Sequence, residues 1–120
     1  MHKTTLLLFA VFAHLPAIAG EADVLNVEIS CNDNLKCDFD VTVKHADEGW
    51  DHYANRWEVA SPDGTILATR VLAHPHVNEQ AFTRSMRNVE IPRAVSEVTV
   101  RAHDSVHEYG GKEVTVKVPN

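Results

Sequence analysis

Residues 97–118, EVTVRAHDSVHEYGGKEVTVKV, decide the fold. Apolar side chains take every second position in both halves of this stretch: Val98, Val100 and Ala102 in the first half, and Val114, Val116 and Val118 in the second. Such alternation is typical of a β-strand with one buried face. Between the two halves, Gly110 and Gly111 give the backbone the freedom that a turn requires. The stretch therefore predicts a β-hairpin.

The same alternation continues backward along the chain, in residues 24–30, 38–44, 53–60, 65–72 and 81–91. In the first of these runs, the pattern predicts that Leu25, Val27 and Ile29 share the buried face. Turn signals separate the runs, among them a Ser-Pro-Asp-Gly sequence at residues 61–64. Because no run has an apolar stripe at helical spacing, we expect an all-β domain of seven strands.

Seven short strands in about a hundred residues are typical of an immunoglobulin-like sandwich. In this pattern, and in the closing hairpin of residues 97–118, the chain resembles the fibronectin type III and immunoglobulin-like superfamily. Trp57 falls where such folds often place a core tryptophan. The chain is also similar to uncharacterised secreted bacterial proteins. The resemblance implies a seven-stranded sandwich, and it implies no activity, because a fold does not determine a function.

Residues 1–19 have the pattern of a secretory signal peptide. A basic start at Lys3 precedes a largely apolar run, and Ala-Ile-Ala at residues 17–19 provides the small-x-small cleavage position. We predict cleavage after Ala19; cleavage after Gly20 and an uncleaved anchor are the alternatives. The remaining residues, 20–120, then form a single domain in the periplasm or outside the cell, without a further membrane segment.

The charge of the chain disfavours two classes of partner. Its 11 Lys and Arg and 17 Asp and Glu give a net charge of −6. Removal of residues 1–19 takes away one basic residue and no acidic residue, so the net charge becomes −7. An acidic surface without a basic patch argues against binding nucleic acid or an anionic membrane. It is compatible with binding a cation, and equally with a surface that serves only solubility.

Both cysteines, Cys31 and Cys37, follow the predicted cleavage site. In an oxidising compartment, this close pair predicts a disulfide that closes the first hairpin. A metal–thiolate pair is the alternative, but no histidine lies within the loop to complete such a site.

Six histidines follow the cleavage site: His45, His52, His74, His76, His103 and His107. If successive strands alternate in direction, the loops at residues 45–52, 73–80 and 104–111 lie at one end of the sandwich, opposite the cysteines. We call this end the histidine pole. Neutral imidazole is the commonest metal-ligand side chain in proteins. The sequence therefore predicts a zinc or copper site at the histidine pole.

His74 and His76 form the sharpest local element of that pole. Side chains two positions apart on an extended backbone point to the same side, so we expect both to be central ligands, joined by at least one of the other four histidines. Three acidic residues of the same loops, Asp51, Glu79 and Asp104, are expected to orient the histidines through hydrogen bonds.

A second interpretation needs no metal. The histidines would then be structural or pH-sensing, held by Asp51 and Asp104, and the polar loops would bind a protein or small ligand. We expect no enzymatic activity. Ser105 lies near His103 in the sequence and could form a hydrolytic pair with it, but the chain has no nucleophile elbow and no glycine-rich oxyanion loop to support such chemistry. A blue-copper site is disfavoured as well, since it needs a cysteine next to its histidines.

Overall fold

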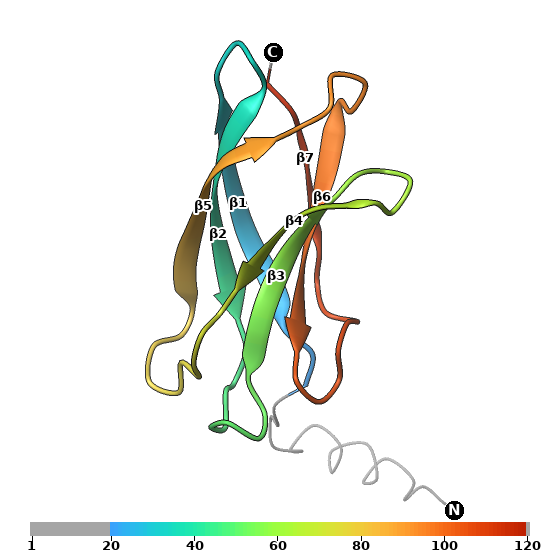
Figure 1. Cartoon of the computed structure of the whole chain (residues 1–120). Helices are drawn as coiled ribbons and strands as arrows, with labels where there is room; N and C mark the ends of the chain where they lie inside the picture. Colours follow the sequence, from blue (N-terminus) through green and yellow to red (C-terminus); the bar gives the residue numbers. More distant parts are fainter. Residues whose placement is uncertain (1–19, 120) are drawn as a thin grey trace, which may run out of the picture.

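The computed structural model describes residues 20–119, which form two facing β-sheets. The strands are β1 (Asp23–Cys31), β2 (Lys36–Lys44), β3 (Ala54–Ala60), β4 (Ile66–Val71), β5 (Phe82–Glu90), β6 (Glu97–Asp104) and β7 (Val114–Lys117). One sheet has the order β1-β2-β5 and the other β4-β3-β6-β7, with every pair antiparallel (Figure 1). The predicted seven-stranded all-β sandwich is confirmed, and its arrangement is consistent with an immunoglobulin-like fold.

The core lies between the two sheets and is built from the faces that the alternation predicts. Phe39, Val41 and Val43 of β2 are fully buried, in one cluster with Trp57 and Val59 of β3. Burying side chains of this size contributes about 1.5–3 kcal/mol each. The apolar faces of the strands are therefore the main source of stability, and the loops are left to carry polar residues.

Strand β1 departs from the predicted pattern at Leu25. Its register against β2 shifts between Val24 and Asn26. Such a bulge adds one residue to a strand and moves the alternation to the opposite face. Val24 is therefore buried, whereas Leu25 is 41% exposed. The expectation that Leu25 shares the buried face is wrong; Val27 and Ile29, beyond the bulge, do pack against the core.

The predicted disulfide is present between Cys31 and Cys37. The two residues lie directly opposite each other in the β1–β2 ladder, with their Cα atoms 4.0 Å apart. Asn32 ties the intervening turn, because its Oδ1 accepts hydrogen bonds from the amides of Asn34 and Lys36. The first hairpin is thus closed both covalently and by hydrogen bonds.

The three histidine-bearing loops meet at one end of the sandwich, and the β1–β2 hairpin, which the disulfide closes, lies at the other (Figure 1). These loops are β2–β3 at residues 45–53, β4–β5 at residues 72–81 and β6–β7 at residues 105–113. Residues 1–19, which include the predicted signal peptide, and residue 120 lie outside the described residues. Within residues 20–119, no helix has the length and hydropathy that crossing a bilayer requires.

Candidate metal centre

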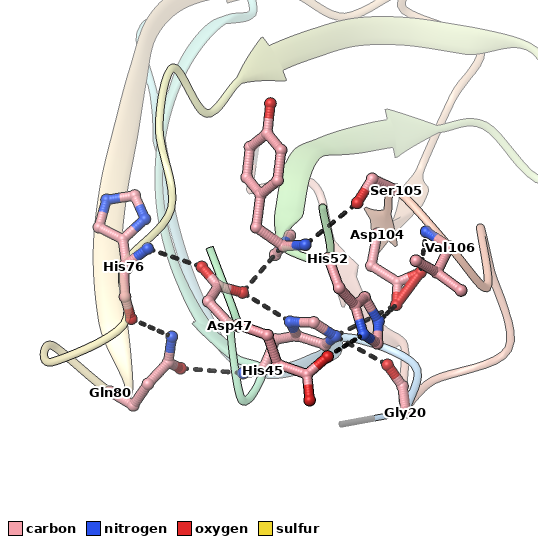
Figure 2. Close-up of polar contacts among 12 residues, drawn as sticks. Gly20, His45, Asp47, His52, His76, Gln80, Asp104, Ser105 and Val106 are labelled. Carbon is pink, nitrogen blue, oxygen red and sulfur yellow. Dashed lines mark hydrogen bonds and ion pairs between the residues drawn. The ribbon is translucent and has the colours of Figure 1, made fainter. Parts of the chain in front are cut away.

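Asp104 lies at the centre of the histidine pole. It ends β6, and its side chain is completely buried. Its Oδ2 lies 3.1 Å from Nε2 of His45 and 2.9 Å from Nε2 of His52 (Figure 2). Nδ1 of His107 is 3.1 Å from the same oxygen. Three imidazole nitrogens, from the β2–β3 and β6–β7 loops, therefore converge on one carboxylate oxygen.

The second oxygen of Asp104 holds the β6–β7 loop in place. Oδ1 accepts hydrogen bonds from the backbone amides of Val106, His107 and Glu108. Aspartate commonly stabilises a turn in this way, by accepting from amides two to four residues ahead. The bonds fix the carboxylate, so that Oδ2 stays directed at the histidines.

A carboxylate holds each of the two buried histidines from the far side of its ring. Nδ1 of His45 lies 2.6 Å from Oδ1 of Asp47, and Nδ1 of His52 lies 2.9 Å from Oε1 of Glu48. Each ring therefore turns its Nε2 toward Asp104 (Figure 2). Metal-binding histidines are typically held like this, with one ring nitrogen at a carboxylate and the other at the metal.

Asp47 also fastens the β2–β3 loop to its surroundings. It accepts hydrogen bonds from the amide of Ala54, where β3 begins, and from the amide of His76 in the β4–β5 loop. Gln80 adds a second link, since it accepts from the amide of His45 and donates to the carbonyl of His76 (Figure 2). The start of β3 and the β4–β5 loop thus help to position the buried ring of His45.

The electrostatics of the cluster follow from these contacts. Burial would lower the pKa of His52, but its hydrogen bonds with Asp104 and Glu48 outweigh burial and raise the pKa above 6.5. Burial would raise the pKa of Asp104, but hydrogen bonds from His52 and His107 lower it to about 2. Asp104 is therefore an anion at neutral pH, and the atoms around it attract either protons or a cation.

Within residues 20–119, one group of three or more His, Cys, Asp or Glu residues could hold a metal ion. It consists of His45, His52 and Asp104, whose ligand atoms all lie within 4.8 Å of one another. A tetrahedral zinc ion with ligands at about 2.1 Å has them roughly 3.4 Å apart. The nitrogen–oxygen distances of 2.9 and 3.1 Å would need to open by only a few tenths of an ångström. His107 is a further donor beside this group, with Nδ1 3.1 Å from Oδ2 of Asp104, and its side chain is 36% exposed.

His74 and His76 lie apart from this group, so the structure does not place them at its centre as predicted. His76 is buried and stacks on Phe82, with ring centroids 4.0 Å apart, and its Nε2 accepts a hydrogen bond from Arg84. Burial and the charge of Arg84 lower the pKa of His76. His74 is exposed, and its Nδ1 bonds to the carbonyl of Pro75.

His103, Asp51 and Glu79 are separate from the cluster as well. The ring of His103 bonds to Asn55 through Nδ1 and packs against Tyr109 of the β6–β7 loop. Asp51 is exposed, and Glu79 pairs with Arg84 at 3.2 Å. Neither carboxylate contributes the histidine-orienting hydrogen bond expected of it, while Asp104 belongs to the candidate ligand group itself.

The orienting role belongs instead to Asp47 and Glu48, for which the sequence held a weak signal. Both lie between His45 and His52, within two and four residues of the ring that each one holds. A contact between His45 and the carbonyl of Gly20 had no such signal, because 25 residues separate the two. Spacing along the chain can suggest contacts between residues a few positions apart, but not a contact between residues from distant segments.

A search of known proteins adds one relative. Over 96 residues, the chain is 38% identical to a protein of Halomicrobium mukohataei named "Putative lipoprotein". The matched region covers 80% of this chain and 47% of that protein, so the chain spans about half the length of its relative. No protein-family model matches the chain, and no solved structure does.

Proposed function

We propose that this protein binds a transition-metal ion, zinc or copper(II), at the histidine pole. His45, His52 and Asp104 would supply the ligands, with His107 as the next donor. The observation that carries this proposal is the shared orientation of two buried rings: each has Nδ1 at a carboxylate and Nε2 at Asp104. Imidazole nitrogen with carboxylate oxygen is a donor set that suits both metals.

The hydrogen bonds of the cluster also explain why a metal would be favoured. Within residues 20–119, the polar contacts of Nε2 in His45 and His52 are with oxygen acceptors, so each nitrogen needs a proton or a metal ion on it. A divalent cation would replace two such protons and would neutralise the buried charge of Asp104. Metal uptake should therefore release protons.

The proposed role is to carry or hold a metal outside the cytoplasm rather than to catalyse a reaction. The signal-like residues 1–19, the disulfide and the lipoprotein name of the relative support that location. The hydroxyl of Ser105 accepts from the amide of Tyr53, and within residues 20–119 it makes no hydrogen bond to a histidine. A serine–histidine pair for hydrolysis is thus not assembled among these residues.

A pair of matched variants tests the ligand assignment. Calorimetry with zinc and with copper(II) should give one ion per wild-type chain. His52→Gln should weaken binding at least roughly tenfold, as for loss of a metal-site contact. His74→Gln changes an exposed histidine of the same pole and should leave affinity unchanged. If His74→Gln weakens binding and His52→Gln does not, the assignment is wrong; if the wild type takes up neither ion at micromolar concentration, the proposal fails.

A second candidate function is a binding module that recognises a protein through the same pole. Each of the three histidine-pole loops carries one exposed large apolar residue: Trp50 at 68%, Val77 at 53% and Val106 at 54%. Exposed apolar side chains on loops fixed by a rigid scaffold are common in recognition surfaces. If the metal proposal fails, Trp50→Ser would test this one, because it should abolish co-purification of a specific partner without changing the fold.

A further inference from the structure

The backbone of Gly20 lies against the proposed metal ligands. Its carbonyl oxygen is 2.8 Å from Nε2 of His45 (Figure 2). The same nitrogen is 3.1 Å from Oδ2 of Asp104, and that oxygen is 2.9 Å from Nε2 of His52. For ligand bonds of about 2.1 Å, neighbouring ligand atoms are roughly 3.0 to 3.4 Å apart. The Gly20 carbonyl oxygen is 2.8 Å from Nε2 of His45, slightly closer than this, so a small outward shift would bring it to the spacing of a further ligand.

Contacts further along the chain fix Gly20 at this place. Ala22 is buried, and the side chain of Asp23 accepts a hydrogen bond from the amide of Lys112 in the β6–β7 loop. Gly111 packs against the backbone of Ala22 so closely that a Cβ there would lie 1.9 Å from the carbonyl oxygen. The segment just before β1 is therefore held against the loop that follows Asp104.

The predicted cleavage after Ala19 makes Gly20 the first residue of the processed protein. Cleavage converts its amide nitrogen into an α-amine, and a free amine has a lone pair available to a metal near neutral pH. The amine and the carbonyl of one residue are close enough to bind a single ion as a chelate. Within residues 20–119, no atom beyond the adjacent residues lies within 4 Å of a Cβ built at Gly20, which leaves the new terminus room to turn.

We propose that signal-peptide cleavage completes the metal centre: the α-amine and the carbonyl oxygen of Gly20 bind the ion together with His45, His52 and Asp104. This inference rests on the proposed metal binding. It gives processing a chemical consequence, since the precursor has only an amide nitrogen at this position and would bind the metal more weakly. It also favours cleavage after Ala19 over cleavage after Gly20, which would remove both donor atoms.

The test compares three samples that differ only at or near the metal centre. The full precursor is exported through its own leader and purified, and mass spectrometry reads its first residue, expected to be Gly20. A second chain carries one extra alanine before Gly20, which keeps the carbonyl but displaces the amine. A third carries His74→Gln, which changes an exposed histidine of the same pole and leaves Gly20 and the proposed ligands as they are. Thermal unfolding without metal checks that all three fold alike.

We expect the extended chain to bind copper(II) at least roughly tenfold more weakly than the exported protein. Its electron paramagnetic resonance spectrum should show one fewer nitrogen bound to copper. The His74→Gln chain should match the exported protein in both respects. Equal affinity and equal spectra for all three chains would overturn this inference and leave the histidine–aspartate centre standing. A first residue of Glu21 would overturn it as well. Absence of binding in all three would instead remove the proposed function.

Discussion

Asp104 performs two tasks with its two carboxylate oxygens. One oxygen accepts hydrogen bonds from three backbone amides and so shapes the β6–β7 loop. The other oxygen faces His45, His52 and His107. A buried carboxylate without such partners would be costly, because transferring an unpaired charge out of water is unfavourable. Loop geometry and metal affinity therefore depend on the same side chain.

Asp104→Asn should show both dependences. The amide lacks the negative charge, and its NH₂ group cannot accept from the loop amides or the imidazoles that it would face. We expect the free energy of unfolding to fall by about 3–5 kcal/mol, as when one partner is removed from a buried ion pair, and metal binding to be lost. Denaturant unfolding and calorimetry would measure this.

Asp51→Asn is the matched control, since Asp51 is an exposed aspartate of the same pole. Its effect should stay within about 0.5 kcal/mol, as for most surface substitutions. An equal loss of stability in both variants would contradict the central role of Asp104.

The pH dependence of stability should identify His52. Its raised pKa means that its ion pairs with Asp104 and Glu48 contribute fully below pH 6.5 and are lost as pH rises through the higher folded-state pKa. His76 and His103 have lowered pKa values and act in the opposite sense, so the total curve mixes the two trends. The difference in unfolding free energy between wild type and His52→Gln isolates His52. In metal-free protein, this difference should be largest below pH 6.5 and shrink above it; a difference that grows with pH would refute the argument.

Asp104 should determine how the metal-free protein behaves in acid. Its pKa of about 2 lies below the ordinary value of 3.8, so its contribution is complete above pH 3.8 and is lost as pH falls toward 2. In an acid titration followed by circular dichroism, wild type should lose stability steeply over this window. Asp104→Asn, which has no group to protonate there, should show a shallower loss.

At the scale of single elements, the bulge in β1 makes a prediction about neighbouring residues. Val24 is fully buried and Leu25 is 41% exposed, although the alternation of the strand favours the reverse. Val24→Ala should therefore destabilise the protein by roughly 1–3 kcal/mol through lost burial and a small cavity. Leu25→Ala removes more atoms but should cost less than about 1 kcal/mol. Chemical denaturation of the two variants would decide, and a costlier Leu25→Ala would argue against the bulge.

The first hairpin offers an independent prediction. Replacing Cys31 and Cys37 together by Ser opens a loop of sequence separation 6, which should cost about 2 kcal/mol in the chain-entropy model. Metal affinity should not change, because the disulfide and the histidine pole lie at opposite ends of the sandwich (Figure 1). A large fall in metal affinity in this folded double variant would mean that the two ends are coupled.

At the scale of the whole molecule, the histidine pole connects segments that the sheets alone leave separate. Contacts of His45, Asp47 and Asp104 join the β2–β3, β4–β5 and β6–β7 loops and the segment before β1 at Gly20. A ligand that binds only the folded state stabilises it by about 2.7 kcal/mol at a hundred times its Kd.

Saturating zinc or copper should accordingly raise the Tm by roughly 10–20 °C for a domain of this size, and a chelator should reverse the shift. The Asp104→Asn variant should show no shift under the same conditions. A Tm that does not respond to metal in the wild-type protein would count against the centre as a whole.

Much of this fold was predictable from the sequence because strand patterning is local. Alternation such as that of Phe39, Val41 and Val43 identifies the buried face of a strand from its own residues, and counting strand directions brings the histidine loops to one end. The position of Cys31 and Cys37 across one hairpin is equally local. The error at Leu25 has a physical cause, since a bulge is a feature of pairing between two strands.

The candidate centre could be predicted only in part. The sequence determined by itself that seven strands enclose a core, that a disulfide closes the first hairpin, and that six histidines gather at the other end. That His45 and His52 face Asp104 while His76 packs on Phe82 depends on how the loops fold against one another. The reason is that spacing along the chain sets the side to which a loop residue points, whereas the partner that it meets depends on carboxylates, amides and a backbone carbonyl from distant segments. Those groups become neighbours only when the two sheets pack.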